Sequence, residues 1–373
     1  MAGDIAERVR ELIARSGLTQ AEFAAKTGLD PSKMSKSLAG KRRFTSLDLA
    51  RIADVGGASV DWLLGTATGM PSVAARSSAV SSSPTEEAVR EAETLAQLRA
   101  DLSYLGYSRQ VVALGPVPTS GLCVEQGRRL AEKARDHAQR SGFDPWEKRD
   151  LADPLEEAFG VDVRIVRLPD GFDGLGWADE HCRLMVVNTS RVPARQRFTI
   201  AHELGHLLAG DDQGLHLDAN LHDAGHRKRP TEMRANAFAA EFLLPEALLR
   251  AEAARLTWSE ESFARLACRL WVTPVNLAWR LLGLELIDRR QFDVLGRMTA
   301  ASAARLAGAM SVFAEWIASA SRPRVPTSLV RTTYQAYADG KATLRPFANL
   351  LGVDTATLRQ AISEPREDFP LTP

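Results

Sequence analysis

The stretch Arg197-Phe-Thr-Ile-Ala-His-Glu-Leu-Gly-His-Leu-Leu208 carries the most specific chemical signal of the chain, an HExxH motif made of His202, Glu203 and His206. Residues four apart on an α-helix lie above one another on one face, so both imidazoles can reach a single metal ion. The glutamate between them then lies beside the water that the metal polarises. Apolar residues recur at helical spacing in the same stretch and predict a core-facing side. The motif therefore predicts a helix that carries a zinc peptidase site.

The residues on either side of this helix supply context and a third ligand. Upstream, the apolar and β-branched run at 181–188 predicts a strand. Downstream, the stretch 231–245 predicts a second apolar helix with Glu232 in its first turn. Catalytic zinc takes three protein ligands and one open position, and two histidines with one glutamate form an established set. Glu232 is the expected third ligand, and Asn236 one turn later is expected either to hydrogen-bond a ligand histidine or to serve helix packing.

Other histidines offer alternative roles at such a site. The compact HExxHxxGxxH arrangement needs a glycine and a histidine where this chain has Ala209 and Asp212, so that arrangement is excluded. His216, His222 and His226 lie in a polar segment typical of a loop, where a histidine is usually solvated. The alternative for one of them is a place in the cleft as an electrophile beside the scissile carbonyl.

Two groups of residues make the chain similar to the ImmA/IrrE family of bacterial metallopeptidases. They are the run from Asn188 to Leu208 and the later Glu232-x-x-Ala-Asn-x-Phe-Ala, which ends in Leu-Leu-Pro245. The resemblance covers roughly 121–286. It implies His202, His206 and Glu232 as ligands of Zn²⁺, and Glu203 as the catalytic acid/base. It also implies a substrate class, because family members cleave transcriptional repressors, often those of mobile elements or stress regulons.

The chemistry expected of these residues is hydrolysis of a peptide bond. Zinc lowers the pKa of its bound water, Glu203 takes the proton, and the hydroxide attacks the peptide carbonyl. Glu203 then gives the proton to the leaving amine. The strand around Leu184 and Val186 is expected to pair with the substrate backbone along an exposed sheet edge.

The N-terminal residues predict a five-helix domain with a helix-turn-helix. Apolar spacing predicts a first helix from Ile5 to about Ser16, and a capping box at Thr19–Glu22 opens a second. Gly28 turns the chain, and Asp30 and Pro31 start a third helix. Further helices are expected over 46–54 and 59–64. Two short helices joined by a tight glycine-containing turn form a helix-turn-helix.

A cluster of cations coincides with the second helix of this unit. The cluster comprises Lys33, Lys36, Lys41, Arg42 and Arg43. Cations there are the expected footprint of phosphate contacts, while Ser32, Lys33 and Lys36 can reach base edges; Gln20 is a further candidate contact. A solvated basic face is the alternative. Residues 4–65 resemble the phage-repressor type (XRE, Cro/C1-type), which implies binding to a double-stranded DNA operator, usually as a homodimer.

Composition limits the classes of protein. The 373 residues include 47 Lys+Arg and 47 Asp+Glu, so any DNA affinity must come from a local patch. Three cysteines far apart, Cys123, Cys182 and Cys268, indicate neither a disulfide framework nor a cysteine zinc site. No apolar run approaches the ~20 residues that span a bilayer, and no signal peptide is apparent. We therefore expect no membrane partner and a cytoplasmic protein, associated with the nucleoid when bound to DNA.

These features predict a multidomain, mainly α protein with an α+β, zincin-like metallopeptidase core. The N-terminal domain is expected over 1–67, followed by a flexible linker and helical connector over 68–120. The zinc peptidase domain is expected over 121–250. A helical helix-turn-helix-like segment over 251–296 and a helical C-terminal region over 297–373 complete the chain.

Two functional hypotheses follow from this organisation. In the first, the chain is a DNA-binding transcriptional regulator whose zinc-dependent endopeptidase cleaves a repressor-type protein. In the second, it is a regulator with little or no turnover, whose peptidase fold senses metal or binds a protein partner. The presence of Glu203 favours the first, because a pure binding module does not require an acid/base residue.

Overall fold

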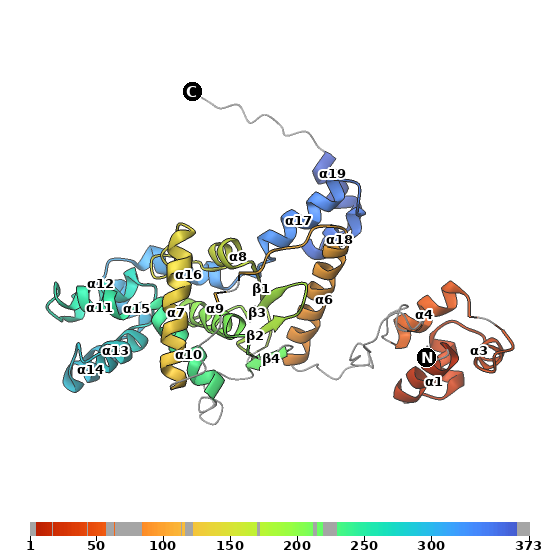
Figure 1. Cartoon of the computed structure of the whole chain (residues 1–373), viewed down its shortest axis with the longest axis horizontal. Coiled ribbons are helices and arrows are strands. Elements are labelled where there is room, and N and C mark those ends of the chain that lie inside the picture. Colours follow the sequence, from red (N-terminus) through yellow and green to blue (C-terminus); the bar gives the residue numbers. More distant parts are fainter. Residues whose placement is uncertain are drawn as a thin grey trace. The chain divides into compact units, whose positions relative to one another are not determined.

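The computed structural model describes residues 5–16, 18–42, 44–56, 63, 84–112, 114–115, 122–169, 172–211, 215–218 and 230–363. The chain divides into two compact units, residues 1–81 and 82–373. Figure 1 labels the elements of both. The boundary between the units lies within the linker and connector expected over 68–120, and the segments expected over 121–250, 251–296 and 297–373 lie in one compact unit.

The first unit is a small helical domain around one apolar core. Its elements are α1 (Ile5–Ser16), α2 (Gln20–Lys26), α3 (Pro31–Leu38) and α4 (Ser46–Gly56). The Thr19 hydroxyl caps α2, and the Asp30 carboxylate accepts from backbone N–H groups at the start of α3. Phe23 and Met34 lie fully buried in the core with Leu63. Leu63 is the part of the expected fifth helix that falls inside the described residues.

A four-stranded sheet organises the second unit. The strands are β1 (Val161–Val166), β2 (Gly174–Ala178), β3 (Arg183–Asn188) and β4 (Leu215–Asp218), in the order β1-β3-β2-β4. β1 runs parallel to β3, and the other pairs are antiparallel. The expectation that β3 offers an exposed edge is wrong, because β3 pairs with β1 on one side and β2 on the other. Leu184 and Val186 are fully buried on this central strand.

Helices cover one face of the sheet and hold the HExxH motif. They are α7 (Cys123–Arg140), α8 (Ala152–Phe159), α9 (Pro193–Ala209) and α10 (Pro230–Leu243). Val163 and Met185 of the sheet share a buried cluster with Leu204 of α9 and Phe238 of α10. The motif helix is therefore fixed between the sheet and α10.

The opposite face of the sheet is covered by α6 (Pro84–Tyr104) and α17 (Thr327–Ala338), and Figure 1 shows α6 in orange beside the strands. Leu95 of α6 and Leu329 of α17 pack with Leu184 in one buried cluster. Arg99 of α6 donates two hydrogen bonds of 2.6 Å to Asp162 of β1. Residues 84–104 are thus part of the second unit rather than a connector. Their apolar side chains cover the face of the sheet that α7 to α10 leave open.

Most of the later helices extend the core on the side of α9 and α10. They are α11 (Glu246–Ala253), α12 (Glu260–Arg269), α13 (Pro274–Gly283), α14 (Arg289–Leu295), α15 (Ala300–Leu306) and α16 (Met310–Ala320). By contrast, α18 (Leu344–Leu351) and α19 (Thr355–Ser363) pack with α17 in a separate small buried cluster. Phe263 and Leu277 belong to the same buried cluster as Leu204. The mainly helical architecture around a small sheet confirms the expected fold class. None of the described helices combines the length and apolar composition that a membrane-crossing helix needs.

Candidate functional site

The helix α9 presents the HExxH residues toward α10 and β2. Pro193 begins the helix, and Gly210, with a φ of 68°, ends it in the left-handed conformation that favours glycine. His202, Glu203 and His206 are all buried. Gly205 lets α10 approach, because a Cβ atom at this position would lie 2.9 Å from Cδ1 of Phe238. The close contact between the two helices brings Glu232 to the histidines.

The three expected ligands converge on one point. Nε2 of His202 lies 3.0 Å from Nε2 of His206, and each nitrogen lies 3.4 Å from a carboxylate oxygen of Glu232. Ligand atoms about 2.0–2.1 Å from a tetrahedral zinc ion are about 3.3 Å apart, so this spacing fits a single Zn²⁺. The two nitrogens and one oxygen are also the donor types that zinc prefers. Among the described residues, this trio is the group of histidine, cysteine and acidic side chains that could hold a metal ion.

Glu203 lies between α9 and β2. A Cβ atom on Gly174 would lie 2.8 Å from Oε1 of Glu203 and 2.7 Å from Cγ2 of Thr199. A Cβ atom on Gly176 would lie 3.4 Å from Oε2 of Glu203. These two glycines of β2 therefore provide the space that the carboxylate occupies. This role was not predicted from the sequence; the alternation Gly-x-Gly in β2, opposite the motif helix, is the signal that could have found it.

A second acid, Asp211, supports the ligand set. Its Oδ2 atom lies 3.0 Å from Nδ1 of His206, on the ring nitrogen that faces away from the trio. Arg234, two residues after Glu232, donates a hydrogen bond to Oδ1 of Asp211. A carboxylate on Nδ1 fixes the tautomer whose Nε2 is free to bind metal. Sequence reasoning missed Asp211 because it follows the helix end, where only the turn at Gly210 brings it back to His206.

The expected supporting contact from Asn236 is not found. Asn236 is half-buried on α10, and within the described residues it forms no hydrogen bond to either ligand histidine. On His206 the contact is made by Asp211 instead. The chain reverses at Gly210, and the backbone N–H of Asp211 donates to the carbonyl of His206. The half-buried position of Asn236 on α10 agrees with the other expected role, packing between helices.

The sheet edge beside the site belongs to β4. The pair β2–β3 closes the edge of β3, and β4 pairs with Gly174 to Trp177 of β2. Among the described strands, β4 has β2 as its one partner, so its other side is an edge of the sheet, one strand away from the glycines that face Glu203. His216 is in β4, while Asp212, His222 and His226 fall outside the described residues.

The helix-turn-helix presents several of the expected contact residues on its surface. Gln20, Ser32, Lys33, Lys36 and Lys41 are exposed, because Met34, Ser37 and Leu38 form the inward side of α3. Arg42 is half-buried and forms an ion pair of 2.7 Å with Asp48, so part of its charge is used within the domain. Arg43 lies outside the described residues. The exposed cations thus gather on and just after α3.

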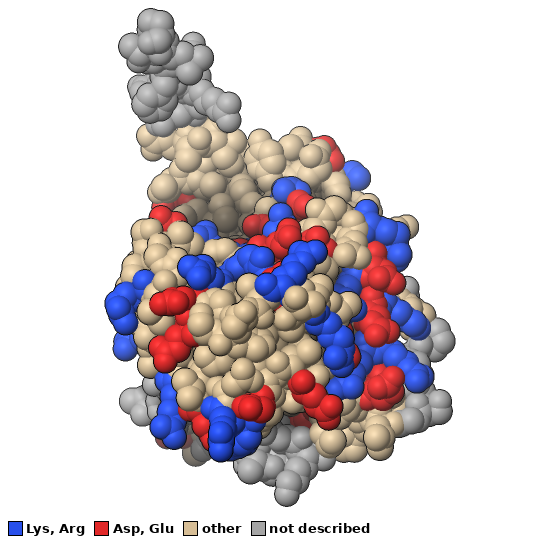
Figure 2. Space-filling view, turned by 90° about the vertical axis from the view of Figure 1, so that its left-hand side faces the viewer, with Lys and Arg blue, Asp and Glu red and all other residues tan. Residues whose placement is uncertain are grey.

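The later helix pairs α12–α13 and α18–α19 lack such a cluster on their second helices, as far as these are described. On α13 the exposed side chains include Val275 and Trp279, and Arg280 forms an ion pair with Glu241. On α19 the exposed cation among the described residues is Arg359. Figure 2 shows basic and acidic side chains interspersed over the face that carries α11 to α15. Each pair contributes buried side chains to the second unit, Phe263 and Leu277 in the first and Phe347 and Leu358 in the second.

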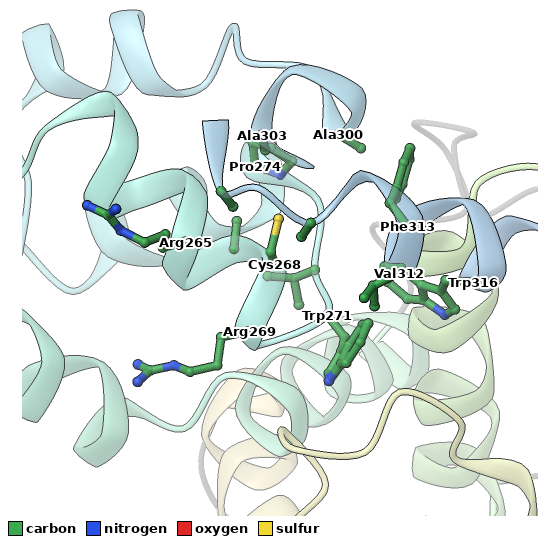
Figure 3. A pocket seen from close by; sticks show the side chains of 14 residues that line it. Arg265, Cys268, Arg269, Trp271, Pro274, Ala300, Ala303, Val312, Phe313 and Trp316 are labelled. Carbon is green, nitrogen blue, oxygen red and sulfur yellow. The ribbon is translucent and has the colours of Figure 1, made fainter. Parts of the chain in front are cut away.

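An apolar cavity of about 300 Å³ lies between α12, α15 and α16. Trp271, Phe313 and Trp316 form one wall and Cys268 points inward, as Figure 3 shows. The cavity is lined by none of the metal-trio residues, so it is not part of the candidate active site.

Comparisons with known proteins match both parts of the chain. Residues 156–282 match the IrrE N-terminal-like domain, and residues 4–63 match a helix-turn-helix domain. The radiation response metalloprotease IrrE of Deinococcus radiodurans is 35% identical over 131 residues, which cover 33% of this chain and 37% of the relative. The protein of the same name from Deinococcus deserti is 33% identical over 127 residues, 33% of this chain and 44% of the relative. The match thus spans less than half the length of these relatives. The chain carries an IrrE-like domain and an N-terminal helix-turn-helix domain, as the two resemblances implied.

Proposed function

We propose that this chain, with its IrrE-like domain behind a helix-turn-helix, is a DNA-binding transcriptional regulator and a zinc-dependent endopeptidase. Its substrate is a repressor-type protein that controls a stress response or a mobile element. The observation that carries the proposal is the convergence of His202, His206 and Glu232 beside Glu203 in one buried cluster. The names of the Deinococcus relatives, radiation response metalloproteases, support the same reaction class.

His202, His206 and Glu232 would hold the metal. When bound, the zinc ion supplies a polarised water and a Lewis acid for the peptide carbonyl. Glu203 accepts the proton of the attacking water and delivers it to the nitrogen of the leaving amine. Asp211 keeps the His206 ring in the orientation that directs Nε2 to the metal. Glu203 is buried, and its carboxylate occupies the space that the missing side chain of Gly174 leaves.

The free edge of β4 is the best place for the substrate backbone. An extended peptide added to this edge gains main-chain hydrogen bonds, and only β4 separates it from β2, the strand whose glycines face Glu203. We propose β4 in place of the central strand β3 for this role.

The N-terminal domain would bring the peptidase to DNA. Lys33 and Lys36 on α3 are exposed at the position where a recognition helix meets the duplex, and binding as a homodimer would pair two such helices. The protein then acts in the cytoplasm, at the nucleoid, where a repressor bound to its operator is close at hand.

A Glu203→Gln variant tests the peptidase. We expect the purified variant to retain zinc, measured by elemental analysis, and to lose cleavage of proteins that the unchanged chain digests. Glu132→Gln, an exposed change on α7, is the matched control. Equal cleavage by the Glu203→Gln and unchanged chains would overturn the catalytic proposal and favour a regulator that uses the fold as a sensor. Proteins trapped by the variant and identified by mass spectrometry would name the substrate.

The double variant Lys33→Ala/Lys36→Ala tests the DNA contacts. Each lost phosphate contact lowers the salt dependence of binding, so we expect weaker binding to selected operator DNA and a salt slope smaller by about one per contact. Lys133→Ala/Lys148→Ala, at two exposed lysines of the second unit, is the control. Unchanged affinity and salt slope in the first variant would contradict the assignment.

A further inference from the structure

We propose that a basic cleft beside Glu203 selects protein segments with acidic side chains next to the scissile bond, and that Arg191 and Arg195 determine this specificity. The inference rests on the proposed peptidase function and names the substrate class of that site. It concerns residues outside the metal trio.

The cleft has a volume of about 920 Å³ and lies where the first turns of α9 meet the ends of β2 and β3. Asp173, Asn188 and Thr199 line its inner part, and Arg167, Arg191 and Arg195 contribute guanidinium groups. Its volume falls in the range of about 300–1,000 Å³ that protein sites for small ligands occupy. The cleft therefore has room for several substrate side chains.

The inner end of the cleft borders the catalytic carboxylate. Thr199 lies one helical turn before Glu203 on the same face of α9. A single point, the Cβ position on Gly174, lies within 3 Å of both Cγ2 of Thr199 and Oε1 of Glu203. Asp173, which also lines the cleft, is the residue before Gly174. A peptide held over Glu203 thus has neighbouring side chains within reach of this cleft.

The charges that line the cleft favour an anion. Arg195 forms an ion pair of 2.6 Å with Asp173, so one positive charge is balanced. Arg191 is exposed and Arg167 donates to the carbonyl of Ser321, and within the described residues neither has a carboxylate partner. The lining therefore carries three guanidinium groups against one carboxylate.

Arg195 has further capacity to donate. Its side chain lines the cleft and remains 41% exposed although one nitrogen of the guanidinium pairs with Asp173. Asn188 is unavailable for a ligand, because its amide donates to the carbonyls of Leu168 and Phe172. Guanidinium groups bind carboxylates through paired, charge-assisted hydrogen bonds. Aspartate and glutamate side chains are thus complementary to the cleft, and lysine or arginine side chains are repelled.

A peptide suits this cleft better than a nucleic acid. The guanidinium groups surround a hollow whose inner wall borders Glu203, whereas duplex DNA is contacted along an open basic surface such as that of α3. Because the cleft lies beside Glu203, the substrate side chains that it accepts also influence which peptide bond is cut.

Cleavage-site profiling tests the proposal. The zinc-loaded full-length chain is incubated with a proteome-derived peptide library, and the cut sites are read by mass spectrometry. We expect aspartate and glutamate to be enriched beside the cleaved bond, and the Arg191→Glu variant to lose that enrichment and to gain lysine at the same position. Arg255→Glu, an exposed change outside the cleft, should keep the profile of the unchanged chain. For a peptide taken from the profile, Glu→Gln replacement should lower kcat/KM about tenfold in the unchanged chain, and much less in Arg191→Glu. No acidic enrichment, or the same enrichment in Arg191→Glu, would overturn the proposal.

A binding measurement separates this proposal from the peptidase proposal. Zinc-loaded Glu203→Gln protein is titrated with a short fluorescein-labelled Glu-Ala repeat peptide and with its Gln-Ala copy. If the unchanged cleft binds the glutamate peptide more tightly than the glutamine copy, and Arg191→Glu abolishes this preference, the acidic-substrate proposal is supported. This holds even if no peptide is cleaved, and in that case only the peptidase proposal fails. Equal binding of the two peptides contradicts the acidic-substrate cleft. So does an Arg191→Glu protein that loses binding to duplex DNA but keeps its preference for the glutamate peptide.

Discussion

Oδ2 of Asp211 lies 3.0 Å from Nδ1 of His206, and Arg234 donates to the other oxygen of the same carboxylate. Arg234 is on α10 with Glu232, while His206 is on α9, so the contact links the two helices that supply the proposed ligands. Such a carboxylate orients a ligand histidine and raises its basicity. The metal site thus extends beyond the trio to a loop residue.

Replacing Asp211 by Asn should weaken zinc binding about 10–100-fold, because the ring of His206 loses its orienting carboxylate. Competition with a chelating dye measures the affinity. Asp136→Asn, an exposed change on α7, is the control and should bind zinc like the unchanged chain. If the Asp211→Asn protein is folded and binds zinc equally well, the carboxylate has no role in the site.

Gly174 and Gly176 form a matched pair of tests for the position of Glu203. Ala at 174 forces Glu203 or Thr199 to move, because the new Cβ atom would lie within 3 Å of both, and overpacking costs about 1–3 kcal/mol. Ala at 176 meets its nearest atoms at 3.4 Å, an adjustment of only a few tenths of an ångström. We expect Gly174→Ala to lower the cleavage rate far more than Gly176→Ala. Equal rates in the two variants would show that β2 does not position the carboxylate.

Arg197 joins the motif helix to the segments packed against it. Its guanidinium is buried and donates to the carbonyls of Lys148, Leu270 and Trp271. Burial lowers the pKa of Arg197 to about 9, which still leaves the group protonated at neutral pH. Arg197→Ala leaves these carbonyls unsatisfied and should lower the free energy of unfolding by more than about 3 kcal/mol.

Urea denaturation followed by tryptophan fluorescence measures this loss. The exposed change Arg255→Ala is the control and should stay within about 0.5 kcal/mol of the unchanged chain. A similarly small effect of Arg197→Ala would mean that water replaces the guanidinium in the fold.

Asp162→Asn tests whether α6 belongs to the second unit. The change removes the carboxylate that pairs with the buried Arg99 at 2.6 Å, and an unpaired buried charge costs about 3–5 kcal/mol. We expect a lower midpoint in thermal unfolding of residues 82–373. Asp101→Asn, exposed on α6, should leave the midpoint almost unchanged. If the two changes behave alike, α6 does not stabilise the sheet.

The cysteines should differ in reactivity with iodoacetamide near pH 8. The thiolate is the reactive form, and burial raises the pKa of both Cys182 and Cys268. Cys123 is half-buried at the start of α7. Timed alkylation read by peptide mass spectrometry should show Cys123 modified first and Cys182 modified only when the protein unfolds. Rapid labelling of Cys182 in the folded protein would indicate that α6 does not cover the sheet.

Local patterns predicted the parts of the site that depend on one helix turn. HExxH spacing fixes His202 and His206 on one face, and the early position of Glu232 in an apolar helix marks it as a candidate ligand, because helical periodicity is a property of neighbouring residues. The role of Asp211 and the buried position of β3 were not predictable in this way. Both depend on contacts between segments that are separated by a chain reversal or by an intervening strand.

The sequence by itself determined the two domain types, the three candidate metal ligands and the basic helix of the first unit, since each is a short-range pattern of residue types and spacing. Only the tertiary structure decided that β3 lies inside the sheet and β4 at its edge, which acid contacts His206 and where α6 packs. It also decided that Arg191 and Arg195 line a cleft beside Glu203. Strand order and helix packing follow from burying both faces of the sheet at once, and that requirement acts on the whole unit rather than on any single segment.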